Sequence, residues 1–565
     1  MDYRAETRTM KMSNSRAQRA MPALALAGMG LLVVVPVLYV LLQALFPDIA
    51  LASLANPFAH WRVLAREGEL GGLLANTLGL GLAVVAGSLL LGLPLGLVRG
   101  LCDLPGARYW DLAFLIPFMI PPYIAAMGWI LLLQPAGYWQ QALGWNGAGL
   151  LFSVPGVVVV MVLNLFPVVY FAVSRAAASA GGRLAMVARI SGASPVQALL
   201  RITLPLMLPS LAASALLVFA MTIEEYGTPA VLASNVGFFV LVTGIERRLS
   251  DWPIDLPGAA LLSCLLMLLA LAAYALQRAL LRGRGYATTD GKPQQLVRAG
   301  LGLWRWPVLA LFALAALAAT LLPLLSIVLT AFTGTLSGGV AADNFTLRHF
   351  AAIFVQGSDA WSALSTSFSL AAGVALLTGA LGSLVAYCVL RFRSRWVLAL
   401  DAVSVLPNAM PGIVVAVGLI LAWNQPWLPI TPYNTWVMLL MAYACLLLPY
   451  PIRYANAALQ QISENLESAA RVHGAGPWTM LGRIVLPLLA PAVGAAMLLV
   501  FSIASRELVA SLLLAPTGMQ TVSVYVWRQF EQGSVGEGMA MSLVAIAVAA
   551  LLVLAAQLLK QREPA

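Results

Sequence analysis

Long runs of apolar residues recur along the whole chain, separated by short polar stretches. A helix needs about 20 predominantly apolar residues to cross the hydrocarbon core of a bilayer. Backbone polar groups cannot stay unpaired in lipid, so each run of that length is expected to be a helix. The first six expected spans are 23–46, 72–98, 109–134, 151–174, 206–232 and 256–278. The second six are 307–332, 366–390, 397–423, 433–455, 486–514 and 537–559.

The composition agrees with this pattern and sets the orientation. The chain is 61% hydrophobic and 10% charged, whereas soluble domains average roughly 45–50% apolar and about 25% charged residues. The net charge of +10 could indicate a nucleic-acid partner. However, most Lys and Arg residues fall on alternate loops, as the positive-inside rule describes. We therefore expect a multi-pass protein of the lipid bilayer, with both termini cytoplasmic and no nucleic-acid partner.

The chain contains an internal repeat. Residues 184–209 and 466–491 align at an offset of 282, and half of the aligned positions are identical. Asp111, Pro117, Pro121 and Gly128 likewise match Asp401, Pro407, Pro411 and Gly418 at an offset of 290. A repeat of this length indicates two fused units. Because each unit has six expected spans, the units should be parallel, with a pathway between them.

The repeat and the spans divide the chain into seven expected segments. They are a cytoplasmic tail (1–22), a first span with its periplasmic loop (23–72), a first transmembrane domain (73–277), a cytoplasmic linker (278–306), a seventh span with its loop (307–361), a second transmembrane domain (362–558) and a cytoplasmic tail (559–565).

The repeated segment has the pattern of a polar elbow between two spans. Residues 465–472 predict a short helix, with Glu467 and Arg471 as i,i+4 partners on its surface. Gly474 suits a helix end in the left-handed conformation, and Pro477 suits the start of the next segment. We expect two short helices bent against each other on the cytoplasmic face. A single copy would fit an ordinary solvated loop equally well, but two copies favour a docking element.

A short cytoplasmic helix, a Gly-Ala pair and a Leu-Pro about a dozen residues later resemble the coupling loop of type-I ABC importer permeases. The resemblance covers roughly residues 73–277 and 362–558. It implies that 184–205, here called the first elbow, and 466–487, the second elbow, dock on an ATP-hydrolysing subunit. The implied coupling residues are Ala188, Arg189, Gly192, Ala193, Pro195, Leu204 and Pro205 in the first elbow, and Glu467, Ala469, Ala470, Arg471, Gly474, Ala475, Pro477, Leu486 and Pro487 in the second.

The two elbows depart from the family pattern in different ways. The usual Glu-Ala-Ala aligns with Met186-Val187-Ala188 in the first elbow and with Ser468-Ala469-Ala470 in the second. Glu467 lies one position earlier, and the first elbow has no acid at all. The resemblance therefore implies that the two halves couple unequally to the ATPase.

The sequence contains no Walker A match and no catalytic or metal-binding cluster. The resemblance implies a non-catalytic permease subunit without a cofactor of its own, in a bacterial inner membrane. ATP and Mg would be bound by a separate cytoplasmic ATPase dimer, and a periplasmic binding protein would deliver the substrate.

Four charged residues follow apolar runs at matched places in the two halves, namely Glu224, Glu225, Arg506 and Glu507. Charges inside a membrane are costly and usually mark function, so these residues are candidates for the outer part of the pathway, where they would favour a cation. The alternative is a structural role where the helix breaks, with Glu507 neutralised by Arg506.

The words EEYGTPAVL, RELVASLLL and TVSVYVWRQFEQGSVGEGMAMS resemble fused permeases of ferric-iron importers. This resemblance implies Fe(III) as the substrate and no lasting metal site in the permease. Permeases for 2-aminoethylphosphonate, thiamine or polyamines are alternatives in the same class. A second hypothesis is a secondary transporter driven by an ion gradient, which would also have two parallel six-span halves. A third hypothesis is a membrane-embedded enzyme.

Overall fold

The computed structural model describes residues 16–49, 53–180, 187–281, 298–392 and 395–561. Apart from turns and two isolated β-bridges, this part of the chain is helical. Nine helices in it are long and apolar enough to cross a membrane, and three bent helix pairs raise the number to twelve. The prediction of an all-α membrane protein is confirmed. Most of both expected tails, most of the linker and residues 184–186 lie outside the described residues.

Each half contains an equivalent series of helices. In the first half these are α4 (Glu69–Leu101), α5 (Ala107–Met119), α6 (Pro122–Leu133), α9 (Val154–Ala180), α11 (Pro195–Ala198), α12 (Leu204–Glu224), α13 (Gly227–Leu232), α14 (Leu241–Ser250) and α15 (Leu256–Leu281). In the second half they are α19 (Asp359–Arg391), α20 (Arg395–Val405), α21 (Gly412–Trp423), α22 (Trp436–Leu447), α23 (Pro449–Leu459), α24 (Glu464–Val472), α25 (Pro477–Met480), α26 (Leu486–Ala504), α27 (Val509–Leu514), α28 (Val522–Glu531) and α29 (Val535–Gln561).

Each half is preceded by one further span that contains a π-helical turn. The first consists of α1 (Arg16–Met29), the π-turn Gly30–Val34 and α2 (Val35–Leu45). The second consists of α16 (Arg305–Ala316), the π-turn Leu317–Leu321 and α17 (Leu322–Phe332). Short helices in the connections are α3 (Ala59–Glu67), α7 (Tyr138–Leu143), α8 (Ala148–Leu151) and α18 (Arg348–Ile353).

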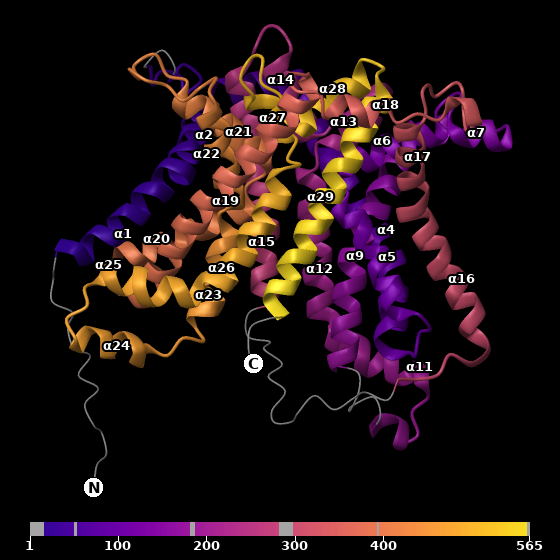
Figure 1. Cartoon of the computed structure of the whole chain (residues 1–565), viewed down its shortest axis with the longest axis horizontal. Coiled ribbons are helices and arrows are strands. Elements are labelled where there is room, and N and C mark those ends of the chain that lie inside the picture. The colour runs from indigo at the N-terminus through magenta and orange to yellow at the C-terminus, as the bar shows by residue number, and fades with distance from the viewer. Residues whose placement is uncertain (1–15, 50–52, 181–186, 282–297, 393–394, 562–565) are drawn as a thin grey trace.

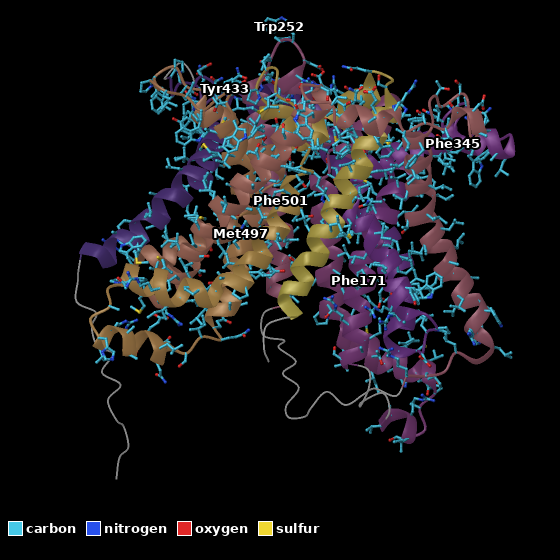
Figure 2. The ribbon with its side chains drawn as sticks, in the orientation of Figure 1. Phe171, Trp252, Phe345, Tyr433, Met497 and Phe501 are labelled. Carbon is cyan, nitrogen blue, oxygen red and sulfur yellow. The ribbon has the colours of Figure 1, made fainter. Side chains whose placement is uncertain are left out.

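The two halves point the same way. Helices α11 and α24 lie at one end of the molecule, here called the elbow end, and α13, α14, α27 and α28 lie at the opposite end (Figure 1). Trp252, Phe345 and Tyr433 also lie at that opposite end, whereas Phe171, Met497 and Phe501 lie at mid-height (Figure 2). Exposed aromatic rings such as Trp252, which is 89% exposed, are typical of the membrane–water boundary. The arrangement is that of two parallel repeats.

Two expected spans are broken, which corrects the prediction of single helices over 109–134 and 397–423. The chain bends by 98° between α5 and the helix that begins at Pro122, and by 118° between Arg395–Ala409 and α21. Ile120 and Met410, the residues before Pro121 and Pro411, are extended. Proline disfavours the helical conformation at the residue before it, so both helices end there.

The expected spans 206–232 and 486–514 are also shorter than predicted. Helix α12 ends at Glu224 and α26 ends at Ala504, and the short helices α13 and α27 follow each break. A smaller bend of 45° separates α22 from α23 at Pro449. Equivalent positions in the two halves therefore carry equivalent breaks, except at Pro167, where α9 continues through the proline.

The leading span of each half packs against the other half. In Figure 1 the indigo helix α2 lies beside the orange α21, and α17 lies beside the purple α6. A methyl group placed on Gly418 would lie 2.8 Å from the carbonyl oxygen of Pro36, and one placed on Gly128 would lie 2.7 Å from that of Pro323. The Ser326 hydroxyl donates to the carbonyl of Gly128 at 2.9 Å. Glycine is therefore required by the close approach of two backbones.

The largest buried cluster is shared by the two halves. It contains Val40 and Ile124 from the first half and Val414 and Met541 from the second, together with residues of α14, α15 and α28. Two other clusters stay mainly within one half each. Because the shared cluster is continuous, the two halves form one packed body in this conformation rather than two separate domains.

We predict that Gly128→Ala and Gly418→Ala each destabilise the protein. The added methyl would press on a backbone oxygen, and overpacking of this kind costs about 1–3 kcal/mol. The check is the thermal unfolding temperature of the purified protein in detergent. Gly79→Ala is the matched control, since nothing lies within 4 Å of a methyl group there. Equal stability of all three variants would contradict the backbone-contact interpretation.

Candidate functional site

The second elbow begins with helix α24, whose end has the geometry expected from the sequence. Gly474 has φ of +82°. Its N–H donates to the carbonyl of Arg471 at 2.9 Å, and the N–H of Ala475 donates to that of Ala470 at 3.0 Å. These two bonds define a Schellman motif, which closes a helix through a left-handed residue. The prediction that Gly474 ends the helix in the left-handed conformation is confirmed.

The first elbow closes its helix in the same way. Gly192 has φ of +95°, its N–H donates to the carbonyl of Arg189 at 3.1 Å, and the N–H of Ala193 donates to that of Ala188 at 2.9 Å. Ser194 then caps α11 through a reciprocal bond pair with Gln197. The same turn thus forms twice from a sequence that is only partly the same.

The segment after each turn differs from the prediction of a second separate short helix. Pro195 and Pro477 do begin α11 and α25. A π-helical turn then leads directly into α12 or α26, which begin with Leu204-Pro205 and Leu486-Pro487. Pro195–Glu224 and Pro477–Ala504 are therefore continuous helices long enough to cross a membrane. Each elbow is therefore joined to its spanning helix without a break in the helix.

The elbows expose apolar side chains at matched positions, which the sequence reasoning did not single out. Ile190 is 81% exposed and Val472, its equivalent in the repeat, is 85% exposed. Val196 and its equivalent Trp478 are 63% and 44% exposed. Apolar surface next to polar groups at the end of a molecule is typical of a protein–protein contact. Both pairs are related by the same offset of 282 residues in the repeat. This equivalence could have identified them from the sequence.

Glu467 is buried rather than on the surface of α24, which corrects the prediction. Its side chain is 1% exposed. One carboxylate oxygen accepts from Nε of Arg391 at 2.6 Å, and the other lies 3.5 Å from a guanidinium nitrogen of Arg471. The Tyr387 hydroxyl donates to the carboxylate at 3.4 Å. The expected i,i+4 pair with Arg471 is present, but the main partner comes from the end of α19.

Arg391 holds the second elbow to the transmembrane bundle. Besides Glu467 it binds Glu464 at 3.1 Å and donates to the carbonyls of Leu459 and Ile462 at 3.5 and 3.3 Å. We call Arg391, Glu467 and Tyr387 the elbow clamp. The sequence could not reveal it, because Arg391 and Glu467 lie on separate helices with no shared motif.

The first half has a different ion pair in the equivalent region. Leu101 and Ala185 occupy the positions that match Arg391 and Glu467. Arg99 instead makes a bidentate pair with Asp111, with the shortest bond at 2.6 Å, and the Tyr170 hydroxyl donates to Asp111 at 2.7 Å. This pair ties α4 to α5 rather than to the elbow. The clamp is thus a property of the second half.

At the break after α12 and after α26, Glu225 and Glu507 occupy equivalent places. The Thr228 N–H donates to Glu225 at 3.2 Å, and the Ala510 N–H donates to Glu507 at 3.0 Å. Each carboxylate therefore caps the short helix that follows the break, α13 or α27. Such capping is favourable because the first N–H groups of a helix have no partner within it. This geometry supports a structural role for these two acids.

Arg506 does not neutralise Glu507, although the sequence suggested that alternative. Over the described ranges no ion pair joins Arg506 to a carboxylate. Its Nη1 is buried without a hydrogen-bond partner, as are the hydroxyls of Tyr123 and Ser523. Glu224 is the last residue of α12. Unsatisfied buried polar atoms are rare in proteins. We call the region around Arg506, Tyr123 and Ser523 the polar zone; its residues come from both halves.

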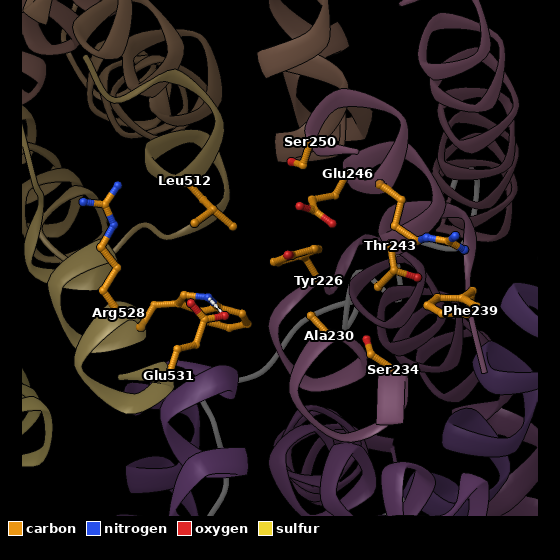
Figure 3. A pocket seen from close by; sticks show the side chains of 12 residues that line it. Tyr226, Ala230, Ser234, Phe239, Thr243, Glu246, Ser250, Leu512, Arg528 and Glu531 are labelled. Atoms are coloured by element: carbon orange, nitrogen blue, oxygen red, sulfur yellow. Dashed lines mark hydrogen bonds between the residues drawn. The ribbon is translucent and has the colours of Figure 1, made fainter. Parts of the chain in front are cut away.

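A cavity of about 370 Å³ lies between the halves at the end opposite the elbows. Figure 3 shows Tyr226 and Glu246 on one side of it and Leu512, Arg528 and Glu531 on the other. The first two belong to the first half and the other three to the second. The sequence reasoning did not find this cavity, because its residues come from segments almost 300 positions apart.

Two stretches of the chain, 88–285 and 378–562, match the family described as "binding-protein-dependent transport system inner membrane component". Together they cover more than half of the chain. In the described part of the chain, no three His, Cys, Asp or Glu side chains lie together so that they could hold a metal ion.

The similar proteins include permeases with two different stated substrates. A putative ferric transport system permease of Haemophilus influenzae is 28% identical over 73% of this chain and 65% of its own length. An Fe(3+)-transport system permease of the same organism is 25% identical over 88% of this chain and 90% of its own length. A putative 2-aminoethylphosphonate permease of Salmonella typhimurium is 28% identical over 40% of this chain and 83% of its own length.

The chain thus spans slightly less than two thirds of the first of these relatives. Both family matches include one elbow and the breaks that follow it, so the predicted resemblance is confirmed in both halves. The chain belongs to the family of binding-protein-dependent transport system inner membrane components.

Proposed function

We propose that this chain is the membrane-spanning permease subunit of an ATP-driven importer. The observation that carries the proposal is the pair of glycine-closed elbows, each continuous with a spanning helix and each exposing apolar side chains at one end of the molecule. A separate ATPase dimer would dock there and bind ATP and Mg, and this chain would have no catalytic role or cofactor. Both termini would then be cytoplasmic, in a bacterial inner membrane.

The elbows supply a physical route for coupling. Ile190 and Val472 would enter apolar grooves of the ATPase subunits, and the continuous helices that begin at Pro195 and Pro477 would carry the displacement into the membrane. The second elbow is clamped to α19 through Arg391, whereas the first lacks an equivalent acid. A displacement of the second elbow would therefore pull on two helices, which supports the expectation of unequal coupling.

Ferric iron is the substrate that we propose, delivered by a periplasmic binding protein. The stated substrates of two similar proteins support it, and acids outnumber Arg506 at the two helix breaks, where Glu225 and Glu507 also act as helix caps. A specific observation favours the second candidate, 2-aminoethylphosphonate, because the unpaired Nη1 of Arg506 could bind an anionic group. Thiamine and polyamines remain further alternatives for a permease of this class.

Substrate and energy source can be tested together. The chain would be reconstituted in proteoliposomes with its ATPase and its binding protein, and uptake of Fe(III) and of 2-aminoethylphosphonate would be measured. We expect uptake of Fe(III) that stops when the ATPase or ATP is omitted. Uptake that continues without the ATPase under an imposed ion gradient would instead identify a secondary transporter.

We predict that Gly474→Val uncouples ATP hydrolysis from uptake without preventing membrane insertion. A side chain in the left-handed region costs about 1–2 kcal/mol. A cost of about 1 kcal/mol already lowers the population of the native turn about fivefold. The readout is the ratio of substrate imported to ATP hydrolysed, at equal abundance in the membrane. Gly192→Val tests the first elbow, with a smaller loss expected.

The matched control for this experiment is Gly476→Val. Gly476 has φ of −75° and ψ of 166°, which valine adopts readily, and nothing lies within 4 Å of an added methyl group at either glycine. Normal coupling is expected for this control. Normal coupling in Gly474→Val would contradict the role of the left-handed turn.

The elbow clamp generates a further prediction. Arg391→Met should release α24, because it leaves the buried Glu467 carboxylate with only the more distant Arg471, and breaking a buried pair costs about 3–5 kcal/mol. Amide hydrogen exchange of α24 should accelerate and coupled uptake should fall. The double variant Arg391→Met/Glu467→Gln should lose less than the sum of the single variants.

Arg395→Met serves as the control, since Arg395 is exposed and its guanidinium contacts only the ring of Trp396 among its described neighbours. Unchanged exchange rates in the Arg391→Met variant would show that the clamp does not hold the elbow.

A further inference from the structure

The cavity at the end opposite the elbows brings oxygen-bearing side chains from both halves together. Tyr226 lies between α12 and α13, and Glu246 lies on α14. Glu531 ends α28, and Trp527 lies one turn before it on the same helix. Figure 3 shows Glu246 and Tyr226 directed toward the space that Glu531 faces from the other side.

Tyr226 has a buried hydroxyl-bearing side chain without a hydrogen-bond partner in the described residues. The side chain is 5% exposed and its ring packs on that of Trp527, with centroids 5.9 Å apart. Its hydroxyl oxygen is not one of the fully buried unpaired atoms, so it is accessible from the cavity toward which the side chain points. This oxygen is therefore available to a group that enters the cavity.

The two carboxylates of the cavity form no ion pair with a described residue. Glu531 accepts a hydrogen bond from Trp527 Nε1 at 2.8 Å, which occupies one oxygen. The nearby Arg247 is engaged elsewhere, at 3.9 Å from Glu69, 3.6 Å from Asp251 and 4.4 Å from the centre of the Phe239 ring. Arg528 is directed away from the carboxylates in Figure 3.

Burial raises the pKa of the Glu246 carboxyl, and the negative charges of Asp251 and Glu531 raise it further, against the hydrogen bond from Ser250 and the charge of Arg247. Keeping both carboxylates ionised is therefore costly here, even though Arg247 and Arg528 also line the cavity. A bound cation would remove that cost, because an opposite charge favours the ionised form.

We propose that this cavity is the first site in the permease to receive the imported cation, a hard metal ion held by the phenol oxygen of Tyr226 and the carboxylates of Glu246 and Glu531. This proposal rests on the proposed import function and names the place of first contact. Carboxylate and other oxygen ligands suit hard cations rather than soft ones. With two carboxylates and one phenol, the site is suited to transient binding rather than to storage.

The aromatic residues favour a metal ion over an organic ammonium. A quaternary or primary ammonium would be recognised through the open face of an aromatic ring. The ring of Trp527 is instead packed between Tyr226, at 5.9 Å, and Tyr123, at 6.3 Å between centroids. The polar edge of the cavity, and not an aromatic face, is what remains available to a ligand.

The division of the ligands between the halves provides a means of release. Tyr226 and Glu246 move with the first half, and Glu531 moves with the second. A relative movement of the halves would separate the ligands, because they are shared across the interface. The affinity of the site for the cation would then fall. Beyond Trp527 and Tyr123 lies the polar zone around Arg506, which would receive the cation next.

The test uses the full-length chain in lipid nanodiscs, titrated with Fe(III) as its nitrilotriacetate chelate. We expect saturable binding and a visible charge-transfer absorption band from a phenol oxygen bound to Fe(III). Tyr226→Phe should abolish the band. Glu246→Gln and Glu531→Gln should each weaken binding by about tenfold or more, because each removes one unit of ligand charge. Asp343→Asn, which alters an exposed acid outside the cavity, should behave like the wild type.

Several outcomes would overturn the site. These are a wild type without the band, a band that survives in Tyr226→Phe, or equal affinities in the wild type and Glu246→Gln/Glu531→Gln. Displacement of Fe(III) by 2-aminoethylphosphonate with no loss in the carboxylate variants would point instead to an anion site. ATPase-dependent uptake of Fe(III) by the reconstituted wild type is measured separately. A failed site with intact uptake therefore leaves the proposed function standing, and absent uptake refutes that function itself.

Discussion

Two glycine–backbone contacts, together with the shared buried cluster, join the two halves into one body. Gly128 on α6 lies against the carbonyl of Pro323, and Gly418 on α21 lies against the carbonyl of Pro36, so the leading span of each half is locked onto the opposite half. In lipid there is no strong hydrophobic force between helices, and close backbone packing through small residues takes its place. These contacts flank the shared buried cluster. The pathway, the cavity and the elbows all depend on the relative position that they fix.

Around this junction lies the route by which we propose that the two elbows act unequally on the opposite end of the molecule. Each elbow is closed by a glycine with positive φ and continues into a spanning helix. Each of these helices ends at a break where a carboxylate, Glu225 or Glu507, caps the next short helix. These short helices and their neighbours α14 and α28 form the walls of the cavity. In the proposed mechanism a displacement at an elbow would reach the cavity through one helix in each half, and through α19 as well in the second half.

Much of this could be predicted from the sequence, because local rules determine it. The number of spans follows from the length of the apolar runs, and the left-handed turns at Gly192 and Gly474 follow from a glycine placed after a short polar helix. The breaks at Pro121 and Pro411 could have been read from the effect of proline on the preceding residue. The angles of these bends could not be predicted, because tertiary packing decides how far the chain bends. Three features could not be predicted from the sequence: the elbow clamp, the packing of each leading span on the opposite half, and the cavity. Each joins residues that share no local pattern, as Arg391 and Glu467 do in the clamp.

The central claim is that the elbows meet a nucleotide-hydrolysing subunit on the cytoplasmic side. The most direct measurement is site-specific photo-crosslinking in intact cells, with a photoreactive amino acid placed at Val472 or at Ile190, the two most exposed apolar positions of the turns. The account predicts a crosslinked product between this chain and an ATPase subunit from both positions. Crosslinks to extracytoplasmic proteins alone, or labelling of these positions by a membrane-impermeant reagent added outside the cell, would contradict it.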